Sequence, residues 1–336
     1  MTRLDRHSGP PQQEGFYWGT ETLFSWPLAT AGGPNSPLIF GNSLEKLAEL
    51  LQYLFSGLTN GAIYALIGLG FGIIFNATAI INFAQGEFVM LGALMVIAFH
   101  ALGLSLPLAF VLAVVAVTIM GLIFERLAIR PAREATPISL IIITVGGGVF
   151  IKGLAMVIWG KDAYTLPPFS GQEPLILAGA TILPQSLWIM GLTVFLVAGL
   201  EIFLRGTILG KALRAASYNP VAARLVGIRV SQMVQFSFAL SAALGAAAGV
   251  LIAPITMGVY DMGTMLGLKG FCAAVIGGLG SSFGVVLGGL LLGVAEALAS
   301  GLISSGYRDA VAFLILLLVL FFRPQGLIGH RPQRSA

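Results

Sequence analysis

Long apolar stretches alternate with short polar segments from about residue 50 to the end of the chain. A helix that spans a membrane needs about 20 mostly apolar residues. By that length, the pattern predicts eight spanning helices, at 50–75, 86–102, 105–124, 137–159, 187–204, 233–253, 283–300 and 306–322. A shorter apolar piece, 270–280, precedes the seventh of them, and the sequence GGLGSS at 277–282 breaks it from that helix.

The amino-acid composition, taken together with this pattern, indicates the fold class. Hydrophobic residues make up 57% of the 336 residues and charged residues only 10%, whereas about a quarter of a soluble domain is charged. The apolar stretches are continuous and do not alternate every second residue, so they predict helices and not the strands of a membrane barrel. We therefore expect an all-α, polytopic helical bundle in a membrane, with about eight transmembrane helices and one short broken or re-entrant element.

Basic residues predict the orientation of these helices, because Lys and Arg in short loops stay on the cytoplasmic side. One loop contains Arg126, Arg130 and Arg133, a second loop at 205–232 is basic without any acidic residue, and the C-terminus carries further arginines. These segments must share one side, which requires an even number of crossings between the second loop and the C-terminus. Only three long stretches lie there, so we expect 254–282 to contain a broken or re-entrant element.

The chain divides into three parts by composition. Residues 1–46 contain several Pro, Gly and Ser residues with mixed charges, which predicts a poorly ordered N-terminal tail. Residues 47–329 make up the transmembrane domain, with its cytoplasmic loop at 205–232. Residues 330–336 are expected to form a cytoplasmic C-terminal tail.

Catalytic and metal-binding patterns are missing from the sequence. Cys272 is the only cysteine, which excludes an intramolecular disulfide and a cysteine metal cluster. The three histidines are scattered, and neither a Walker A sequence nor HExxH occurs. We therefore expect no catalytic residues, no metal site and no cofactor in this chain.

Four ionisable residues lie within or at the ends of the expected spans: Glu87, Lys152, Glu201 and Glu296. Glu201 can pair with Arg205 one helical turn away, and Lys152 can reach toward an interface. A carboxylate at the bilayer centre costs about 2.5–3.5 kcal/mol on insertion scales, so Glu87 and Glu296 need a partner or a wet cavity. For both, bonds to other helices are favoured, and a place along the path of a zwitterionic solute is the alternative.

Two glycine-containing breaks fall in opposite halves of the chain, AQGE at 84–87 and GGLGSS at 277–282. Glycine could free the backbone to turn at these points, and transporters built from repeats hold their substrate near such interrupted helices. The candidate translocation path therefore comprises Gln85, Gly86, Glu87, Gly277, Gly278, Gly280 and Glu296.

The loop GKALRAASYNPVAARLVGIRVSQ, at 210–232, is long enough for two short helices. Asn219 suits the N-cap of the second helix and Pro220 its first position, and Gly227 follows its end. Its paired alanines contribute nothing to binding lipid headgroups, which favours docking to another protein over a basic anchor on the membrane surface.

Several blocks from about residue 50 to 329, in the right order, resemble the permease subunits of branched-chain amino acid ABC importers, and most of all the smaller of the two permeases. The blocks are GLTNGAIYALIGLGFGIIF, INFAQGEFVMLGA, FERLAIRP, NPVAARLVGI, GLKGFCAAVIGGLGSSFGVVLGGLLLGVAEAL and FRPQGLIG.

The resemblance implies a multi-pass protein of the bacterial inner membrane that works with four kinds of partner. These are a second homologous permease, two cytoplasmic ATPase subunits that bind ATP and Mg²⁺, an external substrate-binding protein, and membrane lipid. It also implies that the cytoplasmic loop holds a coupling helix, which rests in a groove of the ATPase. The coupling residues would be Arg214, Asn219, Pro220, Ala222, Ala223 and Gly227.

Two departures from the family pattern are visible. Family members often have His at the position of Gln85, and they generally lack the long N-terminal tail. The first departure leaves open a related importer of urea or short-chain amides. A secondary transporter driven by an ion gradient, with Glu87 and Glu296 as ion sites, is the rival from another class.

Overall fold

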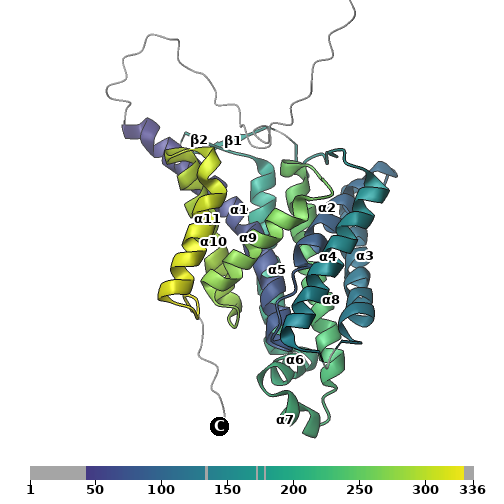
Figure 1. The fold of residues 1–336 in the computed structure, drawn as a ribbon. Coiled ribbons are helices and arrows are strands. Elements are labelled where there is room, and N and C mark those ends of the chain that lie inside the picture. The colour runs from purple at the N-terminus through teal and green to yellow at the C-terminus, as the bar shows by residue number, and fades with distance from the viewer. Residues whose placement is uncertain (1–42, 133–134, 172, 178, 329–336) are drawn as a thin grey trace, which may run out of the picture. The chain divides into compact units, whose positions relative to one another are not determined.

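The computed structural model describes residues 43–132, 135–171, 173–177 and 179–328. Nearly all of this part is helical (Figure 1). The elements are α1 (Ser43–Thr78), α2 (Gln85–Ala101), α3 (Leu106–Phe124) with a π-helical extension (Glu125–Ile129), α4 (Pro137–Trp159), β1 (Leu175–Leu177), β2 (Ala180–Ile182), α5 (Pro184–Gly206), α6 (Ile208–Tyr218), α7 (Pro220–Leu225), α8 (Val230–Thr256), α9 (Met262–Gly277), α10 (Ser282–Leu302), a 3₁₀ turn (Ser305–Tyr307) and α11 (Arg308–Phe322).

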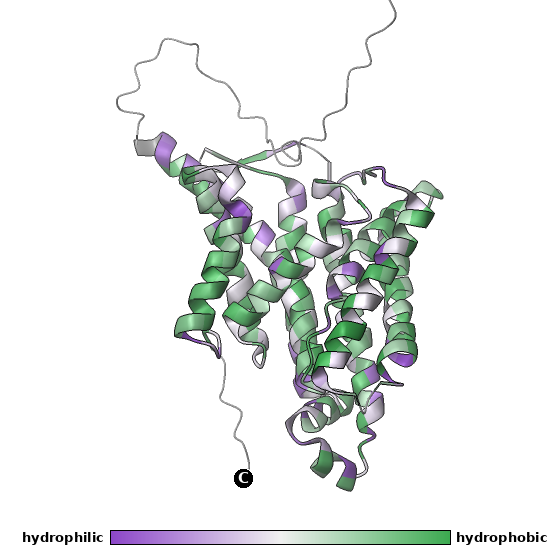
Figure 2. Cartoon of the chain, viewed as in Figure 1, coloured by the Kyte–Doolittle hydropathy of each residue, from purple (hydrophilic) through white to green (hydrophobic). Residues whose placement is uncertain are grey.

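Each of the eight expected spans corresponds to one helix. In the described part of the chain, seven helices are long and apolar enough to cross a membrane, whereas α2 and α9 have 17 and 16 residues. The apolar residues follow these helices along most of their length (Figure 2). The predicted class, an all-α multi-pass membrane bundle, is therefore confirmed, although two of the described helices, α2 and α9, are short where one short element was expected.

Two helices form the centre of the bundle. The most apolar windows of α1 and α8 are 89% and 72% buried, against 6% to 44% for the other five long helices. α1 packs against α10, α8 and α9, and α8 packs against α2 and α3. The other long helices expose large apolar side chains such as Val157 and Phe321, which suits surfaces that face lipid or another membrane subunit.

Small residues let α1 and α10 meet backbone to backbone. A Cβ atom at Gly61 would lie 2.8 Å from the carbonyl oxygen of Gly289 and 2.8 Å from the Cα atom of Leu290. Gly57 faces Gly293 in the same way. Lipid offers no hydrophobic drive for helices to associate, so this close approach, with its dispersion contacts, holds the pair together.

The descending element expected within 254–282 is α9, which is longer than the predicted piece 270–280 and ends at the predicted break. Counted with α8, α10 and α11, it brings the apolar helices between Arg229 and Arg323 to four, which is the even number that the basic loops require. Sixteen helical residues extend about 24 Å, less than the roughly 30 Å of a hydrocarbon core. α9 must therefore be completed by non-helical backbone at its ends.

The break after α9 is fixed by the last described residues. Gly278 has φ +102°, a conformation that favours glycine, and it lies against Gly326. Leu327 donates its backbone N–H to the carbonyl of Ile276 at 2.8 Å, and Ile328 donates to that of Gly277 at 3.2 Å. The C-terminal segment thus satisfies carbonyls that the end of α9 leaves open.

The loop between α4 and α5 and the beginning of α1 each contain structure that the sequence did not predict. The loop between α4 and α5 contains a short antiparallel hairpin, β1–β2, which no pattern in the sequence indicated. Thr181 in β2 donates its N–H to the side chain of Gln52 in α1 at 2.6 Å. α1 begins at Ser43, so residues 43–46 of the expected tail are helical, and the rest of that tail and residues 329–336 lie outside the described residues.

We predict that Gly61→Ala destabilises the protein by about 1–3 kcal/mol, because the added methyl group meets backbone atoms of α10 that cannot move aside. The measurement is the thermal unfolding midpoint in detergent. Gly153→Ala in α4 is the matched control, because a Cβ atom at that position would have nothing within 4 Å and alanine favours a helix. Equal midpoints for the two variants would contradict the role given to the α1–α10 contact.

Candidate functional site

The loop expected to be cytoplasmic forms an elbow of two helices, α6 and α7, as the sequence predicted. The side chain of Asn219 accepts hydrogen bonds from the backbone N–H groups of Val221 and Ala222, both at 3.0 Å, and so caps α7. Pro220 occupies the first helical position, where its missing N–H costs nothing. Gly227 has φ +87° and turns the chain toward α8.

The elbow is fixed to the membrane domain by a small apolar core. Leu213, Ala216, Ala223 and Met233 are buried against one another, and they join α6, α7 and the start of α8. Gly210 lies on the backbone of α5 at Leu204. A force applied to α7 would therefore reach α8 directly and α5 through α6.

A row of large apolar side chains on this elbow is exposed, and the ribbon of α6 and α7 carries both hydrophobic and hydrophilic residues (Figure 2). Tyr218 is 86% exposed, Val221 67%, Leu225 84% and Val226 76%. An exposed apolar patch outside the bilayer is typical of a surface that docks a protein partner. The sequence-based prediction relied on small side chains and missed these four, although the spacing of Val221 and Leu225, one helical turn apart on α7, was visible in the sequence.

The two alanines expected to dock have different positions. Ala222 is exposed, whereas Ala223 is 2% exposed and belongs to the core of the elbow. Arg214, Asn219, Pro220 and Gly227 are exposed. A substitution at Ala223 would therefore test folding of the elbow rather than docking.

Among the candidate path residues, Gln85 joins three helices. Its side-chain amide donates to the carbonyl of Ser241 in α8 at 3.0 Å, and it accepts from the hydroxyl of Ser241 at 2.5 Å. The same hydroxyl lies 2.9 Å from the carbonyl of Gly70 in α1. Gln85 is fully buried, so these contacts give it a structural role in this conformation.

Gly86 was expected to free the backbone to turn, and this expectation was wrong. The turn lies earlier, at 79–84, where Ala79 has φ +57°, and Gly86 is already helical in α2. Its Cα atom would be 2.8 Å from a Cβ atom at Gly267, and it also contacts Gly263. Glycine at this position lets the start of α2 touch the start of α9.

Glu87 lies at the same α2–α9 contact and is 6% exposed. One carboxylate oxygen lies 3.5 Å from the hydroxyl of Thr264, which also accepts a hydrogen bond from Lys152 at 3.3 Å. The other oxygen, Oε2, is buried and has no hydrogen-bond partner among the described residues. Lys152 therefore does more than reach toward an interface, because it lies beside a buried acid.

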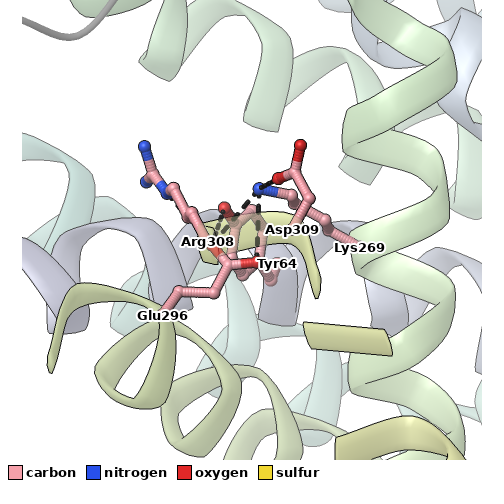
Figure 3. A network of polar contacts seen from close by, with 5 residues as sticks. All are labelled: Tyr64, Lys269, Glu296, Arg308 and Asp309. Atoms are coloured by element: carbon pink, nitrogen blue, oxygen red, sulfur yellow. Dashed lines mark hydrogen bonds and ion pairs between the residues drawn. The ribbon is translucent and has the colours of Figure 1, made fainter. Parts of the chain in front are cut away.

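Glu296 is held by a cluster of charged residues (Figure 3). It is fully buried, accepts from the hydroxyl of Tyr64 at 2.8 Å, and lies 3.2 Å from Lys269 and 3.4 Å from Arg308. Lys269 also contacts Asp309 at 2.7 Å. The cluster, which we call the charge cluster, contains two positive and two negative groups and joins α1, α9, α10 and α11.

The candidate path residues thus form separate groups. Glu87 and Gly86 lie at the start of α9, Glu296 contacts its middle through Lys269, and Gly277 and Gly278 lie at its end. Gly277 touches the backbone of Gly284 in α10, whereas nothing lies near a Cβ atom at Gly280. Lys269, Tyr64 and Asp309 were missed, although a lysine one residue before the expected apolar piece was visible in the sequence.

These features define a multi-pass helical membrane protein with an elbow of two short helices that exposes apolar side chains. The profile of the family described as "Branched-chain amino acid transport system / permease component" matches residues 53–320. The chain belongs to this family and is a permease component of a transport system.

Relatives of named function agree with this placement. The chain is 35% identical to the high-affinity branched-chain amino acid transport system permease protein LivH of Escherichia coli, over 86% of this chain and 98% of that one. It is 34% identical to the corresponding protein BraD of Pseudomonas aeruginosa, over 86% and 99%. A probable branched-chain amino acid transport permease of Methanocaldococcus jannaschii is 28% identical, over 79% and 88%.

We predict that the members of the charge cluster act together. Lys269→Met leaves Glu296 without its nearest cation, and Glu296→Gln leaves two cations facing one anion, so each change is expected to cost about 3–5 kcal/mol. The double variant restores neutrality and should cost clearly less than the sum.

The comparison uses thermal unfolding midpoints of both single variants and the double variant. Glu201→Gln is the control, because the Glu201–Arg205 pair lies on the surface, where such pairs contribute about 0–1 kcal/mol. Strictly additive losses at Lys269 and Glu296 would disprove coupling within the cluster.

Proposed function

We propose that this chain is the smaller permease of an ATP-driven importer of leucine, isoleucine and valine. It would form the translocation path with a second, homologous permease. Two cytoplasmic ATPase subunits, which would bind ATP and Mg²⁺, would drive it, and an external binding protein would deliver the substrate. The observation that carries the proposal is the exposed apolar row on the elbow, at Tyr218, Val221, Leu225 and Val226.

The packing supports a route from this elbow to the membrane interior. α6 and α7 contact α8, and the middle of α8 lies on α2, where Gly249 touches the backbone of Val89. Ser241, also in α8, holds Gln85 at the start of α2. When the ATPase subunits close, a displacement of the elbow would move α8 and with it the α2–α9 contact. This movement would expose the path alternately to the two sides.

The relatives' substrate suits the groups at the α2–α9 contact. An amino acid carries a cationic ammonium group, a carboxylate and, for these three, an apolar side chain. The unpartnered oxygen of Glu87 can accept from the ammonium group, and Lys152 beside Thr264 can receive the carboxylate.

The departure at Gln85, which left urea and amides open, has a packing explanation. Gln85 bonds to Ser241 and is fully buried, so its difference from the family's usual His need not alter solute contacts. This favours branched-chain amino acids over urea or amides. A panel of these solutes, tested for binding-protein-stimulated ATP hydrolysis by the assembled complex, separates the two proposals.

We predict that Leu225→Asp lowers substrate-stimulated ATP hydrolysis by about 30-fold, because truncating or charging an apolar interface anchor costs about 2 kcal/mol or more. Membrane insertion should be unchanged, since this side chain is exposed. Leu225→Met, which keeps the side chain apolar, is the control and should retain most of the activity. Normal hydrolysis by Leu225→Asp in the assembled complex would refute the docking surface.

We predict that Glu87→Gln raises the substrate concentration needed for half-maximal uptake by about tenfold, because a buried charge-assisted hydrogen bond to the ammonium group is lost. Uptake is measured in liposomes that contain the assembled complex. Thermal stability serves as the second readout, because a purely structural role would lower stability and leave this concentration unchanged. Uptake by this chain alone in liposomes would favour the ion-coupled rival instead.

A further inference from the structure

A cavity of about 720 Å³ lies where the basic ends of several elements meet. Thr78 at the end of α1, Ile129 in the π-helical turn, Leu140 at the start of α4 and Pro220 in α7 line it. The positive-inside rule places all of these elements at the cytoplasmic surface of the membrane. The cavity therefore lies at the depth of the cytoplasmic lipid headgroups.

Three arginines line this cavity, Arg130, Arg224 and Arg229. Among the described residues that line it, none is acidic. No ion pair joins any of the three to another described residue. All three are exposed, so their charges give this concave surface a positive potential that attracts anions, and guanidinium groups recognise phosphate oxygens through paired hydrogen bonds.

The remaining lining is partly apolar and partly polar. Ile80, Ile129 and Ile228 provide apolar surface, whereas Thr78 and Gln232 provide hydroxyl and amide groups. A free anion would bind the arginines but make no contact with the apolar lining. An acyl chain alone would contact the apolar lining but leave the arginines unbound. A ligand with a phosphate and an attached apolar chain satisfies both.

The orientation of α7 separates this cavity from the docking surface of the elbow. Pro220 and Arg224, one helical turn apart, line the cavity. Val221 and Leu225 form the neighbouring row on the same helix and remain exposed. The two rows can therefore be occupied at the same time, and a protein partner on the exposed row does not have to enter the cavity.

We propose that the cavity binds the headgroup of an anionic phospholipid of the cytoplasmic leaflet. Arg130, Arg224 and Arg229 hold its phosphate, and the isoleucines contact its glycerol and the first part of its acyl chains. The lipid then bridges the start of α4 with α7 and α8, and so fixes the elbow to the membrane surface. This site is independent of which solute the permease carries.

The test measures lipid bound to the full chain by native mass spectrometry after reconstitution in phosphatidylethanolamine nanodiscs with phosphatidylglycerol. Wild-type protein should retain phosphatidylglycerol selectively. Arg224→Gln combined with Arg229→Gln should weaken retention by about 30-fold, because each basic group near the membrane surface contributes about 1 kcal/mol.

The control is Lys211→Gln combined with Arg214→Gln, which removes the same charge from the exposed side of α6, outside the cavity. It should retain phosphatidylglycerol like the wild type. Equal losses in both double variants would show general surface attraction and overturn the proposal, as would unchanged retention in the first.

A second comparison distinguishes lipid from other anions. Glycerol phosphate and inorganic phosphate should not displace the bound phosphatidylglycerol at millimolar concentration, because they lack acyl chains. Displacement by either would identify a site for a free anion and overturn the lipid proposal. If the purified ATPase subunits displace the lipid, and the arginine variants lose ATPase binding, the cavity receives an acidic protein segment and the lipid proposal fails.

Discussion

The structure depends on one constraint: inside the bundle, a buried polar group is costly unless the protein itself supplies a partner, because lipid supplies none. Lys269 shows the constraint at its strongest. It is a buried lysine in the middle of an apolar helix, and it is tolerated because Glu296 lies 3.2 Å away and Asp309 2.7 Å away. Tyr64 and Arg308 complete the shell of Glu296. The need to neutralise these buried charges therefore fixes the relative positions of α1, α9, α10 and α11.

The same constraint explains the position of α9. This helix is too short to satisfy a whole membrane crossing by itself, so each of its ends must be covered by protein. Gly86 and Glu87 cover its start, and the segment at Leu327 and Ile328 completes its end. Glycine occurs at these contacts because two backbones must touch before their polar groups can be shielded from lipid. α9 consequently contacts both α1 and α2, in the first half of the chain, and α10 and α11, in the second.

The sequence alone predicted the helices, the break at Gly278 and the Asn219–Pro220 start of α7, because each follows from local chemistry. It did not predict the partner of Glu296, since Tyr64 lies 232 positions away in the chain. It also misplaced the turn near Gly86. The sequence does not distinguish a glycine that lets the backbone turn from a glycine that lets another helix approach closely. The exposed apolar row on the elbow was missed because the docking prediction relied on residues with small side chains.

The two intramembrane carboxylates differ in a way that bears on transport. Glu296 is tied to two cations and a hydroxyl, so releasing it for a passing solute would leave buried charges without partners at a cost of several kcal/mol. Each has one oxygen without a hydrogen bond among the described residues, but that of Glu296 lies 3.2 Å from Lys269, whereas Glu87 has only a long contact to Thr264 through its other oxygen. A group that must bind and release a substrate in each cycle cannot already be saturated, so the weaker site is the one suited to transport. Its helix, α2, also packs against α8, which follows directly from the elbow, whereas the charge cluster does not include α8. Rigid charge pairing and a movable polar contact thus lie at different points along α9, which lets one part of the bundle hold its shape while another changes.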